Sequence, residues 1–353
     1  MQNKVLIWLF VAAILAGCST GNNLKENFRL EGSTEGSSSG KIYLQYGFLS
    51  FVHKDSSEIR NGKFSFHGNL GEPVIASLKI EGSNNQAIVF IEPGLIKVTF
   101  TDGNLSNPVV AGSASHEEYK KLMEIENSAR NRDSLLSSYV IQNPHSVVAL
   151  HSFTELASSI LISPDSLRTL FARFDPALQK SRMGRMAAGM ISKKENVMEG
   201  REASEFKAID INGNLFTLSQ FRGKNPVFID FWASWCHPCK EGLSHLEKLF
   251  ERYHEKGLEI IAVSCFETSN ETWKEAISQN NIGNWHNAIS VFGNGKVVNE
   301  DFLLDYPVLP LPRTILIDSQ GKVAGSWEGK SRENYEAMDK AAEKLFEQKD
   351  SQK

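Results

Sequence analysis

The chain has 353 residues, a length that favours two or three domains. Its 38 Lys and Arg residues nearly balance 42 Asp and Glu, for a formal net charge of -4, which excludes the strongly basic surface typical of a nucleic-acid-binding protein. Hydrophobic residues make up 41% of the chain, enough to exclude a wholly disordered protein. The composition therefore indicates a globular protein.

The first 17 residues have the pattern of a signal peptide. A lysine precedes an apolar run that is typical of a signal-peptide core and too short to cross a bilayer as a helix. The run leads into LAGC at positions 15–18, which resembles the bacterial lipobox and implies a lipid on Cys18. The alternative is an ordinary signal peptide that is cut nearby, with Cys18 incidental. Residues 18–27 are polar and would form a tether, so we expect a lipid-anchored protein of the cell envelope that faces the periplasm.

Residues 28–114 consist of short runs in which apolar and polar side chains alternate, the period of a strand with one buried face. Clusters of Gly, Asn, Asp and Ser separate the runs, and Asn61-Gly62 between two of them predicts a tight hairpin. No helical pattern interrupts the series. The sequence therefore predicts a small antiparallel β sandwich or barrel, with strands at 41–46, 63–68, 74–80, 87–92 and 95–100.

Residues 115–199 change to the helical period and predict a helical connector between two β-containing domains. Asn143-Pro144 would end its first long helix. The predicted helix starts are Ser115, in capping-box spacing with Glu118, and Ser163 and Asp175, each followed by a proline. An apolar stripe predicts the core-facing side of one helix, and its members are Leu167, Leu170, Phe171 and Phe174.

From residue 200 to 348, apolar runs alternate with helical patterns, which predicts parallel crossovers and an α/β domain. Cys265 lies in the second apolar run, and we expect it to be a small buried hydrophobe rather than a reactive thiol. The predicted elements are strands at 226–232 and 258–266, helices at 240–257 and 271–279, a hairpin at 313–327 that turns at Gly321, and a closing helix at 332–348.

Two cysteines follow the first of these strands. Cys236 and Cys239 lie in FIDFWASWCHPCK (228–240), and a strand, a Cys-x-x-Cys pair and a helix in this order are typical of the thioredoxin fold. The stretch resembles the thioredoxin active site. A second stretch, LPRTILIDSQGKV (311–323), is similar to the segment of that family with a cis-proline before the third core strand, which implies that Pro312 is that residue.

Within the thioredoxin superfamily, this region looks most like the membrane-anchored, TlpA-like reductases that serve cytochrome c maturation, and like the wider AhpC/TSA group. The resemblance implies thiol–disulfide exchange with no cofactor besides a redox-active disulfide between Cys236 and Cys239. The preceding β region resembles an uncharacterised domain of bacterial lipoproteins. One departure concerns the narrower group, because Gly242 stands where many of those reductases have Glu, and Glu241 would point elsewhere on the helix.

The start of a helix suits an attacking thiol. Cys236 would face unpaired backbone N–H groups and the positive end of the helix dipole, which together lower a cysteine's pKa. Cys239, one turn further along, can attack the mixed disulfide that Cys236 forms with a substrate. Asp230 lies within an apolar strand, so burial should raise its pKa. The resemblance implies that Asp230 exchanges a proton with the second cysteine.

Four further residues are expected to contact a substrate: Trp235, His237, Pro238 and Leu311. Pro238 would also stiffen the first helical turn without the loss of an intrahelical hydrogen bond. A protonated His237 would stabilise the thiolate of the first cysteine. His237 is equally well interpreted as an exposed spacer, and the sequence leaves both interpretations open.

Other uses of the cysteine pair have less support. A zinc site needs a second pair of ligands at similar spacing. A purely structural disulfide is also disfavoured, because the loop between the two cysteines is so short that closing it restrains little chain entropy. Two alternatives remain, a peroxidase and a non-catalytic binding protein with a relic thioredoxin module, although no Thr-x-x-Cys segment of the peroxidase type occurs. We therefore expect a thiol–disulfide oxidoreductase, with disulfide-containing exported proteins and a membrane thiol donor as partners. No nucleic acid or metal is expected, and no particular oligomeric state is indicated.

Overall fold

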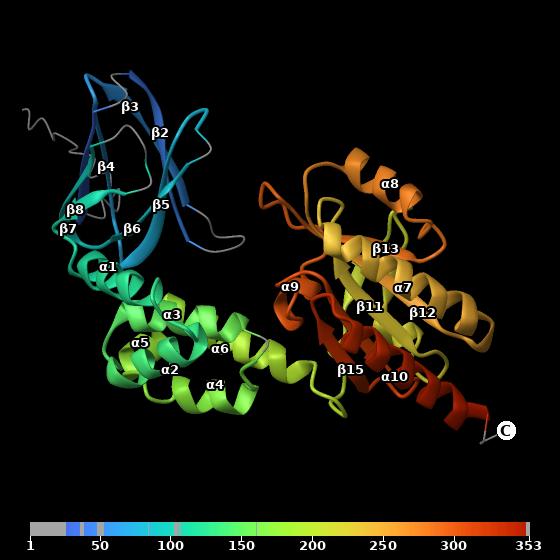
Figure 1. Ribbon diagram of the computed structural model, residues 1–353. Helices are drawn as coiled ribbons and strands as arrows, with labels where there is room; N and C mark the ends of the chain where they lie inside the picture. Colours follow the sequence, from blue (N-terminus) through green and yellow to red (C-terminus); the bar gives the residue numbers. More distant parts are fainter. Residues whose placement is uncertain are drawn as a thin grey trace, which may run out of the picture.

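The computed structural model describes residues 26–35, 39–47, 53–83, 85–101, 105, 107–159 and 161–350. The predicted signal peptide, the lipobox with Cys18 and most of the tether lie outside these ranges. Three parts follow one another along the chain, namely a β domain, a group of helices and an α/β domain (Figure 1). Within the described ranges, no helix is both long enough and apolar enough to cross a membrane.

The β domain is one sheet with the strand order β6-β5-β2-β3-β4-β1-β7-β8, which forms a nearly closed barrel or sandwich around an apolar core. Neighbouring strands are antiparallel except β1 and β7, which run parallel. The predicted antiparallel β sandwich or barrel is therefore confirmed, apart from this one pair. The strands are β1 (Phe28–Thr34), β2 (Ser39–Tyr46), β3 (His53–Arg60), β4 (Lys63–Gly68), β5 (Val74–Ile80), β6 (Ala87–Ile91), β7 (Gly94–Phe100) and β8 (Val109–Ala111).

Local sequence explains how two of these strands meet. Asn61 and Gly62, between β3 and β4, have φ angles of 50° and 70°, as a two-residue hairpin with a twisted turn requires, so the predicted hairpin is confirmed. β4 buries Phe64 and Phe66 and exposes the residue on either side of each, as the alternation predicts. β3 buries only Ile59, so it lacks the alternation on which the predicted strands rest.

In the middle part, the described residues form six helices around a shared apolar core. The predicted stripe of one helix is confirmed, because Leu167 and Phe174 are buried in this core and the two residues between them pack against it. The helices are α1 (Ala114–Glu126), α2 (Arg132–Gln142), α3 (Val147–Ser158), α4 (Pro164–Phe171), α5 (Pro176–Lys180) and α6 (Arg182–Asn196).

Of the three predicted helix starts, two are confirmed and the one at Ser115 is wrong. The first helix is capped by Ser113, whose hydroxyl accepts from the N–H of His116 at 3.1 Å, whereas the Ser115 hydroxyl donates to Glu92 at 2.6 Å. Ser163 caps α4 as predicted. Asp175 is the N-cap residue of α5 as predicted, with proline at the next position. Its carboxylate contacts His145 at 2.6 Å and makes no side-chain cap bond.

The predicted first long helix is also wrong, because it is two helices. The side chain of Asn131 accepts from the N–H of Ser134 at 2.9 Å and so starts α2, a few residues after α1 ends. The sequence pattern did not show this break, because a side-chain cap within a polar segment leaves the apolar period on either side unchanged.

The α/β domain has a five-stranded sheet with the order β13-β12-β11-β14-β15. β11, β12 and β13 are mutually parallel, and β14 and β15 are antiparallel to their neighbours, so the predicted α/β architecture is confirmed. Its elements are β9 (Lys207–Ile209), β10 (Leu215–Thr217), β11 (Val227–Trp232), α7 (His237–Tyr253), β12 (Glu259–Glu267), α8 (Asn270–Gln279), β13 (His286–Phe292), α9 (Asp301–Asp305), β14 (Arg313–Ile317), β15 (Val323–Glu328) and α10 (Arg332–Asp350).

The sheet separates two apolar cores. Phe228 and Trp232 of β11 face the core that also contains residues of α7, α8 and α10. Phe231 of the same strand faces the opposite core, which α9 and the small β9–β10 sheet help to cover. All six residues of β11 are buried, as expected for a strand covered on both faces, and this strand ends four residues before Cys236.

Candidate redox site

The two predicted redox cysteines are joined in a disulfide, with their Cα atoms 5.3 Å apart. Cys236 is the N-cap residue of α7, with extended backbone angles, and its N–H donates to the carbonyl of Ala233 at 3.0 Å. Cys236 is 6% exposed and Cys239 is 0% exposed. Cys236 is therefore the more accessible of the two sulfurs, and it lies at the helix end where backbone N–H groups are unpaired. A sulfur that exchanges with a substrate disulfide must be reachable, so Cys236 is the better placed of the two.

A cis peptide bond joins Leu311 to Pro312, at the position that the resemblance implies. β14 begins at the next residue, Arg313, which pairs with Phe231 of β11. Pro312 therefore lies beside the end of β11, the edge of the sheet from which the chain leads to the cysteines. A second cis bond, Leu309-Pro310, was not predicted from the sequence.

Asp230 is 1% exposed, in the middle of β11. The hydroxyl of Thr314 on β14 donates to its Oδ1 at 2.6 Å, while its Oδ2 has no hydrogen-bond partner among the described residues. Burial is the main cause of a pKa raised to about 7, and the bond from Thr314 offsets it only in part. Because side chains alternate along a strand, Asp230 shares with Trp232 the face that α7 covers.

The four residues expected to contact a substrate lie around the disulfide. The Trp235 side chain is exposed, and its ring N–H donates to the carbonyl of Phe266 at 3.0 Å. Pro238 is exposed in the first turn of α7, and Leu311 is half-buried against both cores. The His237 side chain is 89% exposed, with its Nε2 4.0 Å from Glu241.

Cys265, the remaining cysteine of the described residues, is buried in β12. The Ser290 hydroxyl donates to its sulfur at 3.2 Å. Burial raises the pKa of the Cys265 thiol to about 12, so it holds its proton at neutral pH. The prediction of a buried side chain is confirmed.

Sequence reasoning missed two charged features beside the site. Glu267, at the end of β12, is fully buried and accepts hydrogen bonds from the segment before Cys236. Arg313, next to the cis-proline, forms a buried ion pair with Glu328 of β15, although burial lowers the pKa of Arg313 and raises that of Glu328. A single signal was available for Glu267, an acidic residue that ends an apolar run.

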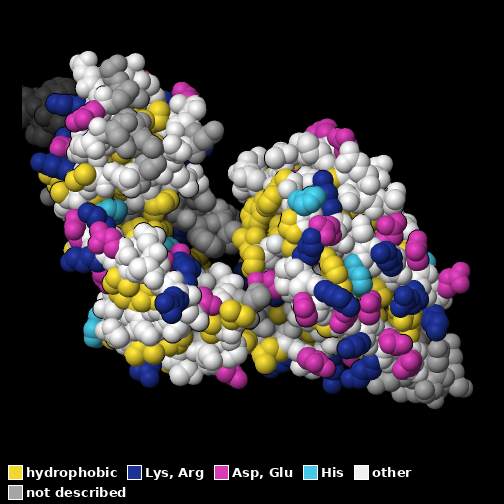
Figure 2. Space-filling view, in the orientation of Figure 1, with side chains coloured by type: hydrophobic (Ala, Val, Ile, Leu, Met, Phe, Trp, Pro, Cys, Tyr) yellow, Lys and Arg dark blue, Asp and Glu magenta, His cyan; other side chains and the backbone are white. Residues whose placement is uncertain are grey.

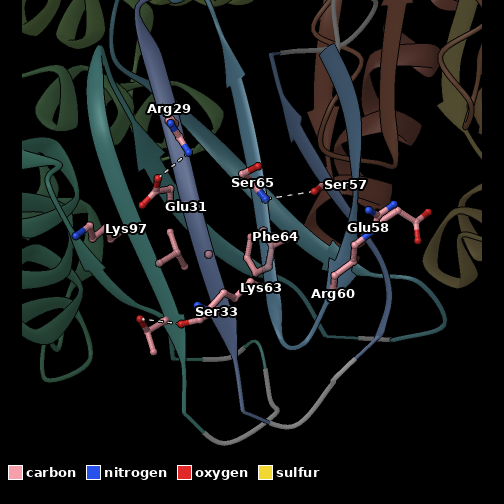
Figure 3. Close-up of a pocket in the computed structure, with 13 residues that line it drawn as sticks. Arg29, Glu31, Ser33, Ser57, Glu58, Arg60, Lys63, Phe64, Ser65 and Lys97 are labelled. Atoms are coloured by element: carbon pink, nitrogen blue, oxygen red, sulfur yellow. Dashed lines mark hydrogen bonds and ion pairs between the residues drawn. The ribbon is translucent and has the colours of Figure 1, made fainter.

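A separate groove of about 630 Å³ lies on the outer face of the β domain, over β1, β3, β4 and β7 (Figure 3). Within it, Arg29 pairs with Glu31 at 3.0 Å, and the Ser65 N–H donates to the Ser57 hydroxyl at 3.2 Å. Its lining contains no cysteine or histidine. The groove therefore takes no part in the arrangement around the disulfide.

Comparison with known proteins agrees with the geometry of the α/β domain. The model of the AhpC/TSA family matches residues 200–327, and that of a domain of unknown function, DUF4369, matches residues 28–119. The thiol-disulfide oxidoreductase ResA of Bacillus cereus is 35% identical over 135 residues, which are 38% of this chain and 72% of that protein. ResA of Bacillus subtilis is also 35% identical, over 37% of this chain and 67% of its own length.

Among solved structures, the thioredoxin domain of a thiol-disulfide oxidoreductase from Bacteroides vulgatus is 26% identical, with a TM-score of 0.34, and is covered over 96% of its length by 40% of this chain. The strand order of the α/β domain and its match to the AhpC/TSA family model define a thioredoxin-fold protein. The chain belongs to the AhpC/TSA thioredoxin-like family, as a thiol–disulfide oxidoreductase with an N-terminal DUF4369 domain.

Proposed function

We propose that this protein reduces disulfides of exported proteins through Cys236 and Cys239. The observation that carries the proposal is the disulfide at the N-terminus of α7, with the more accessible sulfur at the N-cap and Pro312 at the adjacent sheet edge. Disulfide exchange needs two neighbouring cysteines that can alternate between a disulfide and a dithiol.

In the first step, the thiolate of reduced Cys236 attacks one sulfur of a substrate disulfide. A mixed disulfide forms, and the second substrate sulfur leaves as a thiolate that takes a proton. Cys239, as a thiolate, then attacks the sulfur of Cys236, which closes the protein disulfide and releases the first substrate sulfur as a thiol. Two electrons have passed to the substrate, and a thiol donor at the membrane returns the protein to the dithiol.

Asp230 is the proposed base for the second step. Cys239 is fully buried, so bulk water reaches its thiol poorly. Asp230 lies on the same side of the sheet, and burial raises its pKa to about 7, so it can both accept and return a proton near neutral pH. Thr314 fixes one oxygen of its carboxyl group and leaves the other available.

The surface near the disulfide supports a protein substrate. Trp235 and Leu309 are 57% and 45% exposed, and hydrophobic side chains gather along the edge of the α/β domain that faces the β domain (Figure 2). An exposed apolar patch of this kind is typical of a surface that contacts another chain. The signal-peptide pattern and the lipobox support a lipid-anchored location in the cell envelope, facing the periplasm.

Trapping tests this proposal. Cys239→Ser removes the second thiol, so the mixed disulfide formed by Cys236 should accumulate, as adducts visible on non-reducing gels and by mass spectrometry. Cys236→Ser should trap no substrate. Cys265→Ser is the matched control, since that thiol is buried outside the site, and it should turn over a model protein disulfide as the wild type does. Trapping by Cys236→Ser instead would reverse the assignment, and a wild type without turnover would favour a binding protein.

A further inference from the structure

Glu267 is a buried carboxylate that no ion pair joins to a cation in the described part of the chain. Its Oε1 accepts from the backbone N–H of Ser234 at 2.7 Å and from the hydroxyl of Ser264. Its Oε2 accepts from the hydroxyl of Ser234 at 2.5 Å. A buried carboxylate is costly unless donors surround it, and here three donors offset that cost.

The backbone is irregular where it places this side chain. In a regular strand, residues 264 and 267 would face opposite sides of the sheet. The register between β12 and β13 shifts on both sides of Cys265, and Phe266 has a φ of 60°, so Glu267 turns back to the side of Ser264. A left-handed backbone is uncommon at a bulky residue, and such strained positions cluster at functional sites.

The contacts made by this irregular turn converge on the residues just before the first cysteine. Ser234 binds Glu267 through both its N–H and its hydroxyl. Trp235 donates its ring N–H to the carbonyl of Phe266 at 3.0 Å. Together with the bond from the Cys236 N–H to Ala233, these contacts fix the whole segment between the end of β11 and the start of α7.

We propose that Glu267 is the positioning residue of the redox site: it holds Ser234 and Trp235 so that the sulfur of Cys236 stays at the unpaired N–H groups of α7. The inference rests on the proposed redox role of Cys236. Glu267 acts through the place of that sulfur and takes no part in bond making. The other titratable side chains on the elements that carry the site include Asp230 on β11, and His237, Lys240 and Glu241 on α7.

Glu267→Gln distinguishes a positioning role from a purely electrostatic one, because the two predict opposite changes in the pKa of the Cys236 thiol. The variant keeps the shape, removes a negative charge and places an NH₂ donor against donors of Ser234 or Ser264. Loss of the charge alone would lower the pKa of the Cys236 thiol, whereas loss of positioning would raise it by moving the sulfur off the helix end. We expect the pKa of the Cys236 thiol to rise. Alkylation of Cys236 in the reduced protein should then slow roughly threefold to tenfold at mildly acidic pH. The mass of the cysteine-containing peptide measures the extent of alkylation.

Two variants complete the test. Glu275→Gln makes the same change at an exposed site on α8, where the carboxylate accepts from the side chain of Gln279, and its alkylation profile should match the wild type. Ser234→Ala keeps the charge and removes one donor, so it should raise the pKa of the cysteine by a smaller amount, and it carries the test if Glu267→Gln does not fold.

A lowered or unchanged thiol pKa in a cooperatively folded Glu267→Gln or Ser234→Ala protein would overturn the positioning role while leaving the redox role of Cys236 intact. The failure of the redox role is recognised separately. In that case the wild-type Cys236 thiol would already titrate like a free cysteine, before any variant is compared.

Discussion

Replacing Asp230 by Asn should stabilise the protein at neutral pH and leave its stability in acid almost unchanged. The carboxyl group is 1% exposed, with one oxygen bound by Thr314 and the other without a partner in the described ranges. Burial is the largest influence on its pKa and raises it from 3.8 to about 7. The folded protein therefore holds this proton more tightly than the unfolded chain does.

The stability that the bound proton contributes is fully present below pH 3.8 and is lost as the pH rises through about 7, because over this range the unfolded chain releases the proton while the folded protein retains it. A rise in pKa of this size corresponds to about 4 kcal/mol. The amide does not titrate. Like the protonated acid it accepts from Thr314, and its NH₂ group takes the place of the acid's unpaired O–H. Asp230→Asn should thus match the wild type near about pH 4 and exceed it by about 4 kcal/mol above pH 7.

Urea unfolding of the oxidised protein, at a series of pH values, measures this difference directly. Thr314→Val is a useful companion, because loss of the hydroxyl should raise the pKa of Asp230 further and move the pH dependence upward. A stability difference between Asp230→Asn and the wild type that is the same at all pH values would refute the reasoning.

The same variant tests the proposed base. Without a group that accepts the proton of Cys239, closure of the mixed disulfide should slow by roughly a hundredfold or more, and the inflection of its rate near pH 7 should disappear. The first attack by Cys236 should be nearly unchanged. Stopped-flow kinetics separate the two steps, and an unaltered second step would make Asp230 a structural residue only.

Two further predictions concern the buried ion pair and the N-terminus. Glu328→Gln should destabilise the protein by about 3–5 kcal/mol in urea unfolding, because it leaves buried Arg313 without its charge partner. The control is Glu336→Gln, in an exposed pair, which should cost less than about 1 kcal/mol. Equal losses of stability in the two variants would contradict this account. Mass spectrometry of the mature protein should find a diacylated or triacylated Cys18 at its N-terminus, and an unmodified terminus elsewhere would exclude the lipid anchor.

The sequence predicted the elements whose signals are local. β11 and β12 were predicted because nearly every residue in them is apolar. β13 was missed although most of it is buried, because His286 and Asn287 interrupt the apolar run at its start. The Asn287 side chain is fully buried and donates to the carbonyls of Ile282 and Trp285 at 2.7 and 3.0 Å. Such partners exist only in the folded chain, so a single sequence gives no sign of them.

The residues of the candidate site likewise divide into those with a clear signal in the local sequence and those without one. Asp230 stands out in the sequence as an acid inside an apolar run, and the cysteine spacing stands out by itself. Glu267 has a weaker signal, because it only ends an apolar run. A regular strand would place it on the opposite face from Ser264, and the irregular turn at Phe266 brings the two together. The sequence pattern follows the regular period of a strand, so a residue placed by a departure from that period is missed.

The helical part is more than a spacer between two domains, because it contacts the chain that leads to the cis-proline. On α6, Lys193 donates to the carbonyl of Leu303 at 2.5 Å, and Asn196 donates to that of Asp305 at 3.0 Å. These carbonyls belong to α9, and the residues after α9 run directly to Pro312. One side of the proposed redox site is therefore supported from outside the α/β domain, which a thioredoxin module considered alone does not reveal.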